Sequence, residues 1–121
     1  MFIELAIYSG QENPTYELND EETASLRAIL DSLSFTARPV QFSDADHERW
    51  GDRLGYSRIV IEETTDKRYD YYAIRGPHVY KMEDYIRAFE TTDQAVEDWV
   101  RKFLTDKGEI NLAKLITLWK S

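Results

Sequence analysis

The spacing of apolar residues predicts which parts of the chain are strands. Residues 2–8 alternate two sets of mostly apolar positions interrupted by a single glutamate, which is typical of an interior strand. In the stretch 56–75, two runs rich in β-branched and aromatic residues flank the segment 64–67. This composition predicts a central β-hairpin with a four-residue turn.

The register of this hairpin decides which side chains share a face. Pairing Glu63 with Arg68 places Ile59 opposite Tyr72 and Ser57 opposite Ile74, on the face expected to be core. The second face is unusually aromatic, and its members are Tyr56, Val60, Tyr69 and Tyr71. Two explanations stay open. Either Trp99, Phe103 and Trp119 from the C-terminal helices cover this face, or it binds a partner.

Apolar residues at helical spacing predict three amphipathic helices. The first covers about residues 20–33, with Asn19 as its N-cap and Glu22 three residues later. The second covers about 92–107 with Thr91 or Thr92 as its cap, and ends at Lys107-Gly108. The third covers about 111–119.

Shorter segments complete the predicted fold. Residues 16–18 and 78–82 have strand character, and 82–90 fits both a strand and a helix, with the strand favoured. Because strands and helices do not alternate regularly, we predict an α+β fold. A mostly antiparallel sheet with a central hairpin then packs against the three helices, in a single domain that covers residues 1–121.

Composition excludes several classes of protein. The chain has no cysteine, so it forms no disulfide and no thiolate metal site. The start MFIELAIYSG lacks the basic residues and uninterrupted apolar core of a signal peptide, and no apolar run has the length of a membrane span. We therefore expect a cytoplasmic protein that does not cross a membrane.

The formal net charge of −8 disfavours nucleic acid as a partner, because phosphate binding depends on clustered lysine and arginine. An acidic surface favours cationic partners instead. Nucleic acid stays open on one condition, which is that the basic residues near the C-terminus form one continuous face: Arg101, Lys102, Lys107, Lys114 and Lys120.

Three short motifs resemble a known group of proteins. They are Ile7–Pro14 with Leu18 behind it, Leu54–Arg58, and Asp93–Val100. The same order is found in a group of small, uncharacterised, mainly microbial proteins with an IYSGxxNP-type motif, an LGY motif and a DxAxExW-type helix. Gln11 departs from the basic residue usual there, and Tyr16 keeps an aromatic position. The resemblance implies one complete domain and no particular activity.

Candidate chemistry is sparse. Segment 44–48 collects donor groups but lacks the spacing of a calcium or zinc motif, and a solvated helical turn explains it better. Ser9 lacks the context of a nucleophile, and His47 and His78 are the two imidazoles. We assign no catalytic residue, no metal ligand and no cofactor.

Two features are candidate binding sites. The Ser9–Pro14 loop presents Gln11, Glu12 and Asn13, although glycine and Asn-Pro also suit a purely structural turn. The aromatic hairpin face contributes Tyr56, Tyr69 and Tyr71.

These features favour a non-enzymatic, cytoplasmic binding module. Its partner is predicted to be another protein, such as the basic target of an acidic inhibitor or immunity-type protein, or a second copy bound through the tyrosine-rich face. The alternative is a small-molecule binding protein or minor enzyme with a pocket near the Ser9–Pro14 loop, which would use His78 or a tyrosine hydroxyl.

Overall fold

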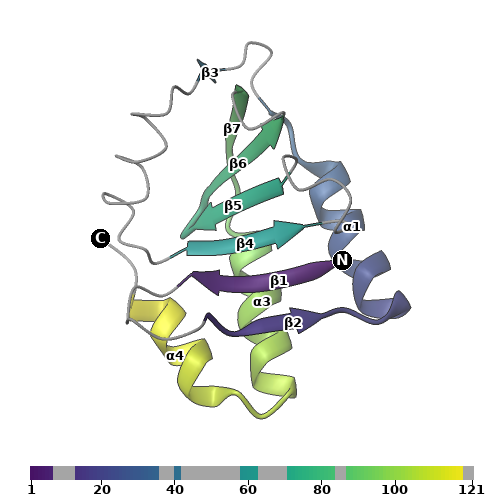
Figure 1. Ribbon diagram of the computed structural model, residues 1–121, viewed down its shortest axis with the longest axis vertical. Coiled ribbons are helices and arrows are strands. Elements are labelled where there is room, and N and C mark those ends of the chain that lie inside the picture. Colours follow the sequence, from purple (N-terminus) through teal and green to yellow (C-terminus); the bar gives the residue numbers. More distant parts are fainter. Residues whose placement is uncertain (7–12, 36–39, 42–57, 63–70, 84–86, 119–121) are drawn as a thin grey trace.

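The computed structural model of the protein describes residues 1–6, 13–35, 40–41, 58–62, 71–83 and 87–118. They form an α+β fold in which helices cover one side of an antiparallel sheet (Figure 1), as predicted. The helices are α1 (Asp20–Ser32), α3 (Ala95–Asp106) and α4 (Ile110–Leu118). The strands are β1 (Phe2–Ala6), β2 (Thr15–Glu17), β3 (Val40–Gln41), β4 (Arg58–Glu62), β5 (Tyr71–Arg75), β6 (His78–Glu83) and β7 (Arg87–Thr92).

The strands form one sheet in the order β2-β1-β4-β5-β6-β7-β3, and each neighbouring pair is antiparallel. The first strand is interior, as its two apolar faces predict, because β2 and β4 flank it. The ambiguous segment 82–90 is strand where the structure describes it, since β6 continues to Glu83 and β7 begins at Arg87.

Strands β4 and β5 of the predicted central hairpin pair antiparallel, but their register differs from the prediction by two residues, and the predicted turn at 64–67 lies outside the described residues. Ile59 pairs with Ile74 and Ile61 with Tyr72, whereas we expected Ile59 opposite Tyr72. A shift of two keeps every side chain on its predicted face, because side chains alternate with a period of two. Both registers bury the same apolar residues, so the hydrophobic pattern cannot distinguish between them.

The main core lies between the helices and the sheet face that carries Ile59 and Ile74. The opposite sheet face has a smaller set of buried residues outside this cluster: Ala6, Val60, Ala73 and Met82. Both faces of the sheet therefore carry buried residues, although the described helices pack on one side of it (Figure 1).

Helix α1 begins at the predicted cap. The Asn19 side chain accepts a hydrogen bond from the Glu22 N–H at 2.8 Å, and the Glu22 carboxylate accepts one from the Asn19 N–H at 3.0 Å. This reciprocal pair satisfies two N–H groups at the start of the helix.

Helix α3 begins later than predicted. Thr91 and Thr92, the expected caps, are the last residues of β7. The Asp93 carboxylate instead accepts a hydrogen bond from the Ala95 N–H at 2.9 Å, and the Asp93 N–H donates to the Pro77 carbonyl at 2.7 Å. Strand pairing with β6 has therefore overridden the local cap signal.

An aromatic seam joins β2, α1 and α3 on the helix side of the sheet. The Trp99 and Phe103 rings stack at 5.4 Å, and Tyr16 meets Phe103 edge-on at 5.9 Å. The Trp99 indole N–H donates to the Ser25 hydroxyl at 2.9 Å. Of the two explanations left open for the aromatic hairpin face, covering of Tyr71 by Trp99 and Phe103 does not hold, because Tyr71 alternates with Tyr72, which packs against the core, and faces the other way. Trp119 and Tyr69 lie outside the described residues.

The capping box predicts an acid-sensitive contribution to stability. The hydrogen bond from the Asn19 N–H, together with the Lys107 ammonium 3.1 Å away, lowers the pKa of Glu22 below its usual value. Ionised Glu22 therefore stabilises the fold above its unfolded pKa, and this contribution is lost as the pH falls through the folded pKa.

Glu22→Gln should lower the free energy of unfolding by about 0.5–1 kcal/mol at pH 7 and have a smaller effect near pH 3. Urea denaturation at both pH values measures this difference. Glu21→Gln, an exposed neighbour in the same turn, is the control for loss of charge at the helix start. Equal effects of the two variants at pH 7 would contradict a specific stabilising role of the Glu22 charge.

Candidate functional site

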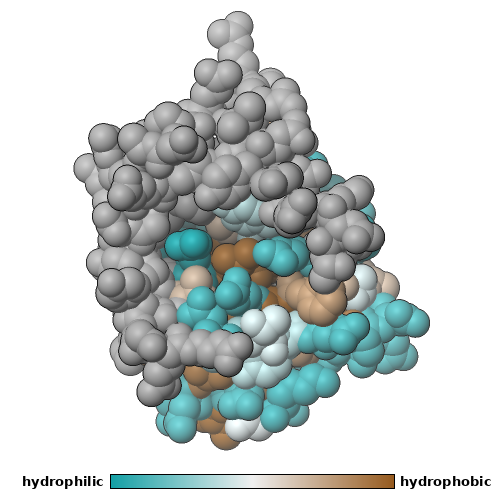
Figure 2. Space-filling view, viewed as in Figure 1, coloured by the Kyte–Doolittle hydropathy of each residue, from teal (hydrophilic) through white to brown (hydrophobic). Residues whose placement is uncertain are grey.

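The sheet face turned away from the helices places aromatic and charged side chains side by side. The register sets Glu62 opposite Tyr71 and Tyr80 opposite Glu90. Arg75 lies opposite His78 on the neighbouring strand. Figure 2 looks onto this face and shows hydrophilic and hydrophobic residues interleaved below its grey part.

An open hollow of about 330 Å³ lies at the β6–β7 side of the sheet. His78 and Tyr80 alternate along β6 and therefore share a face, and β7 brings Thr92 opposite His78. Ser34, two residues beyond the end of α1, completes the lining from another element. The lining residues are Ser34, His78, Tyr80, Glu90, Thr91 and Thr92. Strand register places His78, Tyr80, Glu90 and Thr92 on one face, whereas Thr91 lies opposite the buried Val79 and is therefore on the other face of β7.

The charge of Glu90 acts on the phenol of Tyr80. Burial raises the pKa of Tyr80 above its usual value, and the neighbouring Glu90 carboxylate raises it further. Both effects disfavour the phenolate, because ionisation in a half-buried site beside a negative charge costs free energy. The phenol therefore stays protonated at neutral pH and is available as a hydrogen-bond donor or acceptor.

Sequence reasoning considered His78 as a possible chemical group but missed Tyr80 and Glu90. The spacing of His78 and Tyr80 on a predicted strand already placed them on one face. The position of Glu90 depends on how β7 pairs with β6, and local sequence does not determine this pairing.

Of the predicted binding residues, the structure describes Asn13 and Tyr71. Gln11, Glu12, Tyr56 and Tyr69 lie outside the described residues, as do His47 and segment 44–48. Tyr71 is half-buried on the sheet face that holds Tyr80.

Asn13 has a structural contact that fits the turn interpretation of its loop. Its side-chain amide donates to the Glu4 carboxylate at 3.2 Å, and its carbonyl accepts from the Thr15 hydroxyl at 3.4 Å. Asn13 and Pro14 lead directly into β2 at one edge of the sheet. Strands β1, β4 and β5 separate β2 from β6, so the hollow is far from Asn13 and Pro14, the described residues of the loop near which a pocket was expected.

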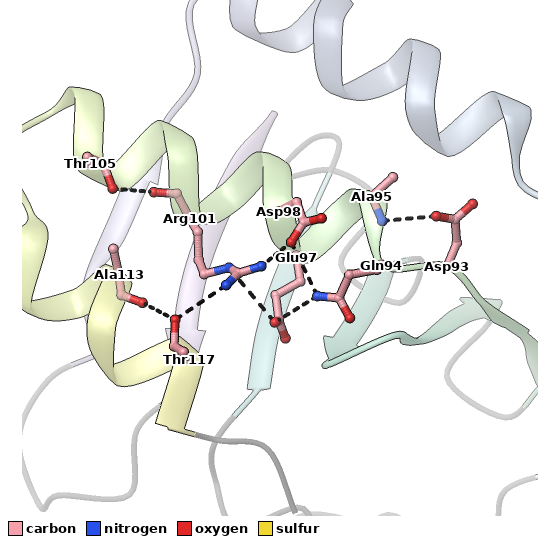
Figure 3. Close-up of polar contacts among 9 residues, drawn as sticks. All are labelled: Asp93, Gln94, Ala95, Glu97, Asp98, Arg101, Thr105, Ala113 and Thr117. Carbon is pink, nitrogen blue, oxygen red and sulfur yellow. Dashed lines mark hydrogen bonds and ion pairs between the residues drawn. The ribbon is translucent and has the colours of Figure 1, made fainter.

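A second polar cluster lies on the side of α3 that faces α4, and it includes a buried carboxylate (Figure 3). The Glu97 side chain is 1% exposed, and its Oε1 accepts from the Gln94 amide at 3.0 Å. The Arg101 guanidinium contacts the Asp98 carboxylate and lies 3.4 Å from the Thr117 hydroxyl of α4. The cluster therefore connects α3 to α4.

The charges in this cluster are incompletely matched. The Nε of Arg101 is buried without a hydrogen bond, and its distance to the Glu97 Oε1 is 4.0 Å. The pair is an ion pair one helical turn apart rather than a direct hydrogen bond. The Arg101 guanidinium is a cationic neighbour of a carboxylate that is almost completely removed from water. We therefore expect the Glu97–Arg101 pair to contribute to the stability of the fold.

The C-terminal basic residues are divided between two sides of α3. Arg101 is directed toward α4 and Asp98 (Figure 3), while Lys107 pairs with Glu22 of α1 at 3.1 Å and lies over the Phe103 ring. Lys102 and Lys114 are exposed, and Lys120 lies outside the described residues.

Within the described ranges, no group of three or more histidine, cysteine, aspartate or glutamate side chains is arranged to hold a metal ion. None of the described helices has the length and hydropathy needed to cross a membrane. No protein-family model, curated protein or solved structure matches the chain significantly.

The Tyr80–Glu90 pair makes a spectroscopic prediction. Glu90→Gln should lower the pKa of Tyr80 toward its usual value while leaving it raised, because burial is the larger cause and remains. Ring-carbon NMR of labelled tyrosine through an alkaline titration measures the change. Glu62→Gln, on the same sheet face but opposite Tyr71, should not shift the Tyr80 titration.

The buried ion pair makes a stability prediction. Arg101→Met should lower the free energy of unfolding by about 1–3 kcal/mol, because it leaves the Glu97 charge buried without its cationic neighbour. Glu97→Gln added to Arg101→Met should recover much of this loss, since the buried group is then neutral. Chemical denaturation of both single variants and the double variant gives the coupling. An effect of Arg101→Met no larger than that of Lys102→Met, an exposed position on the same helix, would show that the pair is unimportant.

Proposed function

We propose that this protein is a binding module without catalytic activity, and that it docks a basic partner protein on the sheet face turned away from the helices. The observation that carries the proposal is the grouping of Tyr71, Tyr80, Arg75 and Glu90 on that face. Tyrosine and arginine are enriched at protein interfaces, where an amphipathic side chain buries area and keeps a polar tip.

The charge of the chain supports a basic partner. The net charge is −8, and the acidic residues that contribute to it include the exposed Asp20, Glu21 and Asp31 of α1. An acidic molecule attracts a basic partner from a distance and increases its association rate at low salt. An inhibitor or immunity-type protein that neutralises a basic protein would use this attraction.

The distribution of the basic residues does not support nucleic-acid binding. Arg101 and Lys107 each contact carboxylates, and they do so toward different helices. A phosphate backbone needs several cations along one surface. Lys102 of α3 and Lys114 of α4 are exposed as well.

A second candidate function is small-molecule binding or a minor enzymatic activity in the hollow. His78 and Glu90 on neighbouring strands are groups capable of acid–base chemistry, and this observation favours the second candidate. We prefer docking because the hollow is open and its volume of about 330 Å³ is at the small end for metabolite pockets.

The absence of cysteine and the resemblance noted above are compatible with a cytoplasmic microbial protein, and this location is part of the proposal. The resemblance adds no function.

A charge placed on the docking face tests the proposal. Tagged wild-type protein should recover a stoichiometric basic partner from its native lysate, and Thr92→Lys should reduce the recovered amount at least tenfold. Thr92 is exposed on the proposed face, so the new lysine repels a basic partner without disturbing the core.

Thr105→Lys is the matched control, because Thr105 is exposed on α3 on the helix side and should tolerate the same change. Equal recovery with Thr92→Lys and Thr105→Lys would contradict docking on this face. Light scattering of both variants tests self-association. If the wild-type protein is a dimer and Thr92→Lys dissociates it, the partner is a second copy of the chain. The proposal of a basic partner is then wrong.

A further inference from the structure

We infer that β2 is a docking edge for an extended, basic segment of a partner protein, which adds to the sheet as a further antiparallel strand. The inference goes beyond the docking face proposed above, whose groups are on β5, β6 and β7. In this mode of recognition the backbone groups of the edge strand supply the hydrogen bonds, and the side chains beside them give specificity.

The hydrogen bonds between β1 and β2 show how the backbone of β2 is oriented. The Leu5 N–H donates to the Pro14 carbonyl at 2.9 Å. The Leu18 N–H donates to the Met1 carbonyl at the same distance. In an antiparallel pair, residues that exchange hydrogen bonds alternate with residues that do not. Every second residue of β2 therefore directs its backbone groups away from β1.

The outward groups belong to Thr15 and Glu17. Both residues are exposed, and Tyr16 between them directs its own N–H and C=O groups toward β1. Among the described strands, β1 is the neighbour of β2, which is the first strand in the sheet order. The edge therefore offers donors and acceptors at the spacing that another strand requires.

The helix layer continues beyond this edge. Figure 1 shows α3 passing behind β2 and extending past it before the turn to α4. The Phe103 ring of α3 meets the Tyr16 ring of β2 at 5.9 Å, and the helix continues from there to Asp106. A strand added to β2 would therefore have the end of α3 on its helix side.

This layer favours an extended segment over a second copy of the chain. Two β2 strands paired antiparallel would be related by a two-fold axis close to Tyr16. Each α3 would then extend past the shared edge toward the other, and the two helix ends would compete for the same space. A segment without a helix layer of its own avoids this overlap.

The charges around the edge favour a basic segment. Glu17 is exposed on β2, and Glu109 is exposed in the turn between α3 and α4. Burial raises the pKa of the Tyr16 phenol and the Glu109 carboxylate raises it further, which places this second charge near the edge. The nearby cation Lys107 is paired with Glu22 at 3.1 Å. Basic side chains on the added strand are therefore attracted to the two carboxylates.

The register of the added strand fixes the direction of its side chains. The segment residue opposite Tyr16 lies on the helix side, over the end of α3. Its two neighbours are opposite Thr15 and Glu17, exchange hydrogen bonds with them and point to the other face. A lysine opposite Glu17 then makes a favourable cross-strand pair.

A pentapeptide tests the edge without the partner. The sequence acetyl-Thr-Lys-Val-Lys-Thr-amide puts valine opposite Tyr16 and lysine opposite Glu17. In an NMR titration of the full chain, we expect a Kd on the order of 1 mM. The amide signals of Thr15 and Glu17 should shift more than that of Tyr16, whose N–H already points to β1. Shifts that are largest outside β2 would overturn the proposal.

Two N-methylated peptides are matched controls for the hydrogen bonds. Methylation of one lysine backbone nitrogen removes a donor to β2 and should weaken binding at least tenfold. Methylation of the valine nitrogen, which points away from β2, should change the Kd by less than about twofold. Equal binding of the two methylated peptides would overturn strand addition.

A variant of the edge tests the charge. Glu17→Lys should weaken binding of the unmethylated peptide about fivefold, because like charges then lie opposite each other. Asp31→Lys makes the same change in net charge at the exposed far end of α1, and it should change the Kd by less than about twofold. Thermal unfolding confirms that both variants are folded. Equal loss in the two variants would assign binding to net charge and overturn the edge.

The edge and the docking face fail separately. Thr92→Lys on β7 should leave peptide binding nearly unchanged, because β7 and β2 lie near opposite edges of the sheet. Loss of peptide binding in this variant would overturn binding at β2. Peptide binding that depends on Glu17 would support the edge whether or not the docking face captures a partner.

Discussion

Burial of one face of the sheet beneath α1 and α3 is the constraint on which the rest of this structure depends. The isoleucines of β1, β4 and β5 alternate with residues on the opposite face, so covering one set necessarily presents the other set away from the helices. The aromatic seam of Tyr16, Trp99 and Phe103 then holds an edge strand against the helices. Tyr71, Tyr80 and Glu90 are all on this opposite face.

Polar contacts refine the packing rather than create it. The capping box at Asn19 sets where α1 begins, and the Asp93–Pro77 hydrogen bond holds the start of α3 against the β5–β6 turn. Arg101 connects α3 to α4 while balancing the buried charge of Glu97. A carboxylate this deeply buried is costly unless a cationic group lies nearby.

The sheet face turned away from the described helices and the hollow both depend on how the strands pair. Strand pairing aligns Tyr80 with Glu90 and His78 with Thr92, and the chain leaving α1 brings Ser34 beside them. Three distant parts of the sequence thus meet in one place. Individually these residues are ordinary strand or loop positions, and their proximity arises from the fold.

The sequence by itself determined the α+β class, the helices, the strand character of β1 and β6 and the face on which Tyr71 lies, because these depend on local periodicity. Only the tertiary structure decided the hairpin register, the delayed start of α3 and which side of the sheet the described helices cover. Two hairpin registers bury the same residues, and Thr91 and Thr92 suit a helix cap as well as a strand. The pairing partners on other strands therefore decide the register and the end of β7. The hollow belongs to the same category, because Glu90 acquires its neighbour Tyr80 through strand pairing that no local pattern encodes.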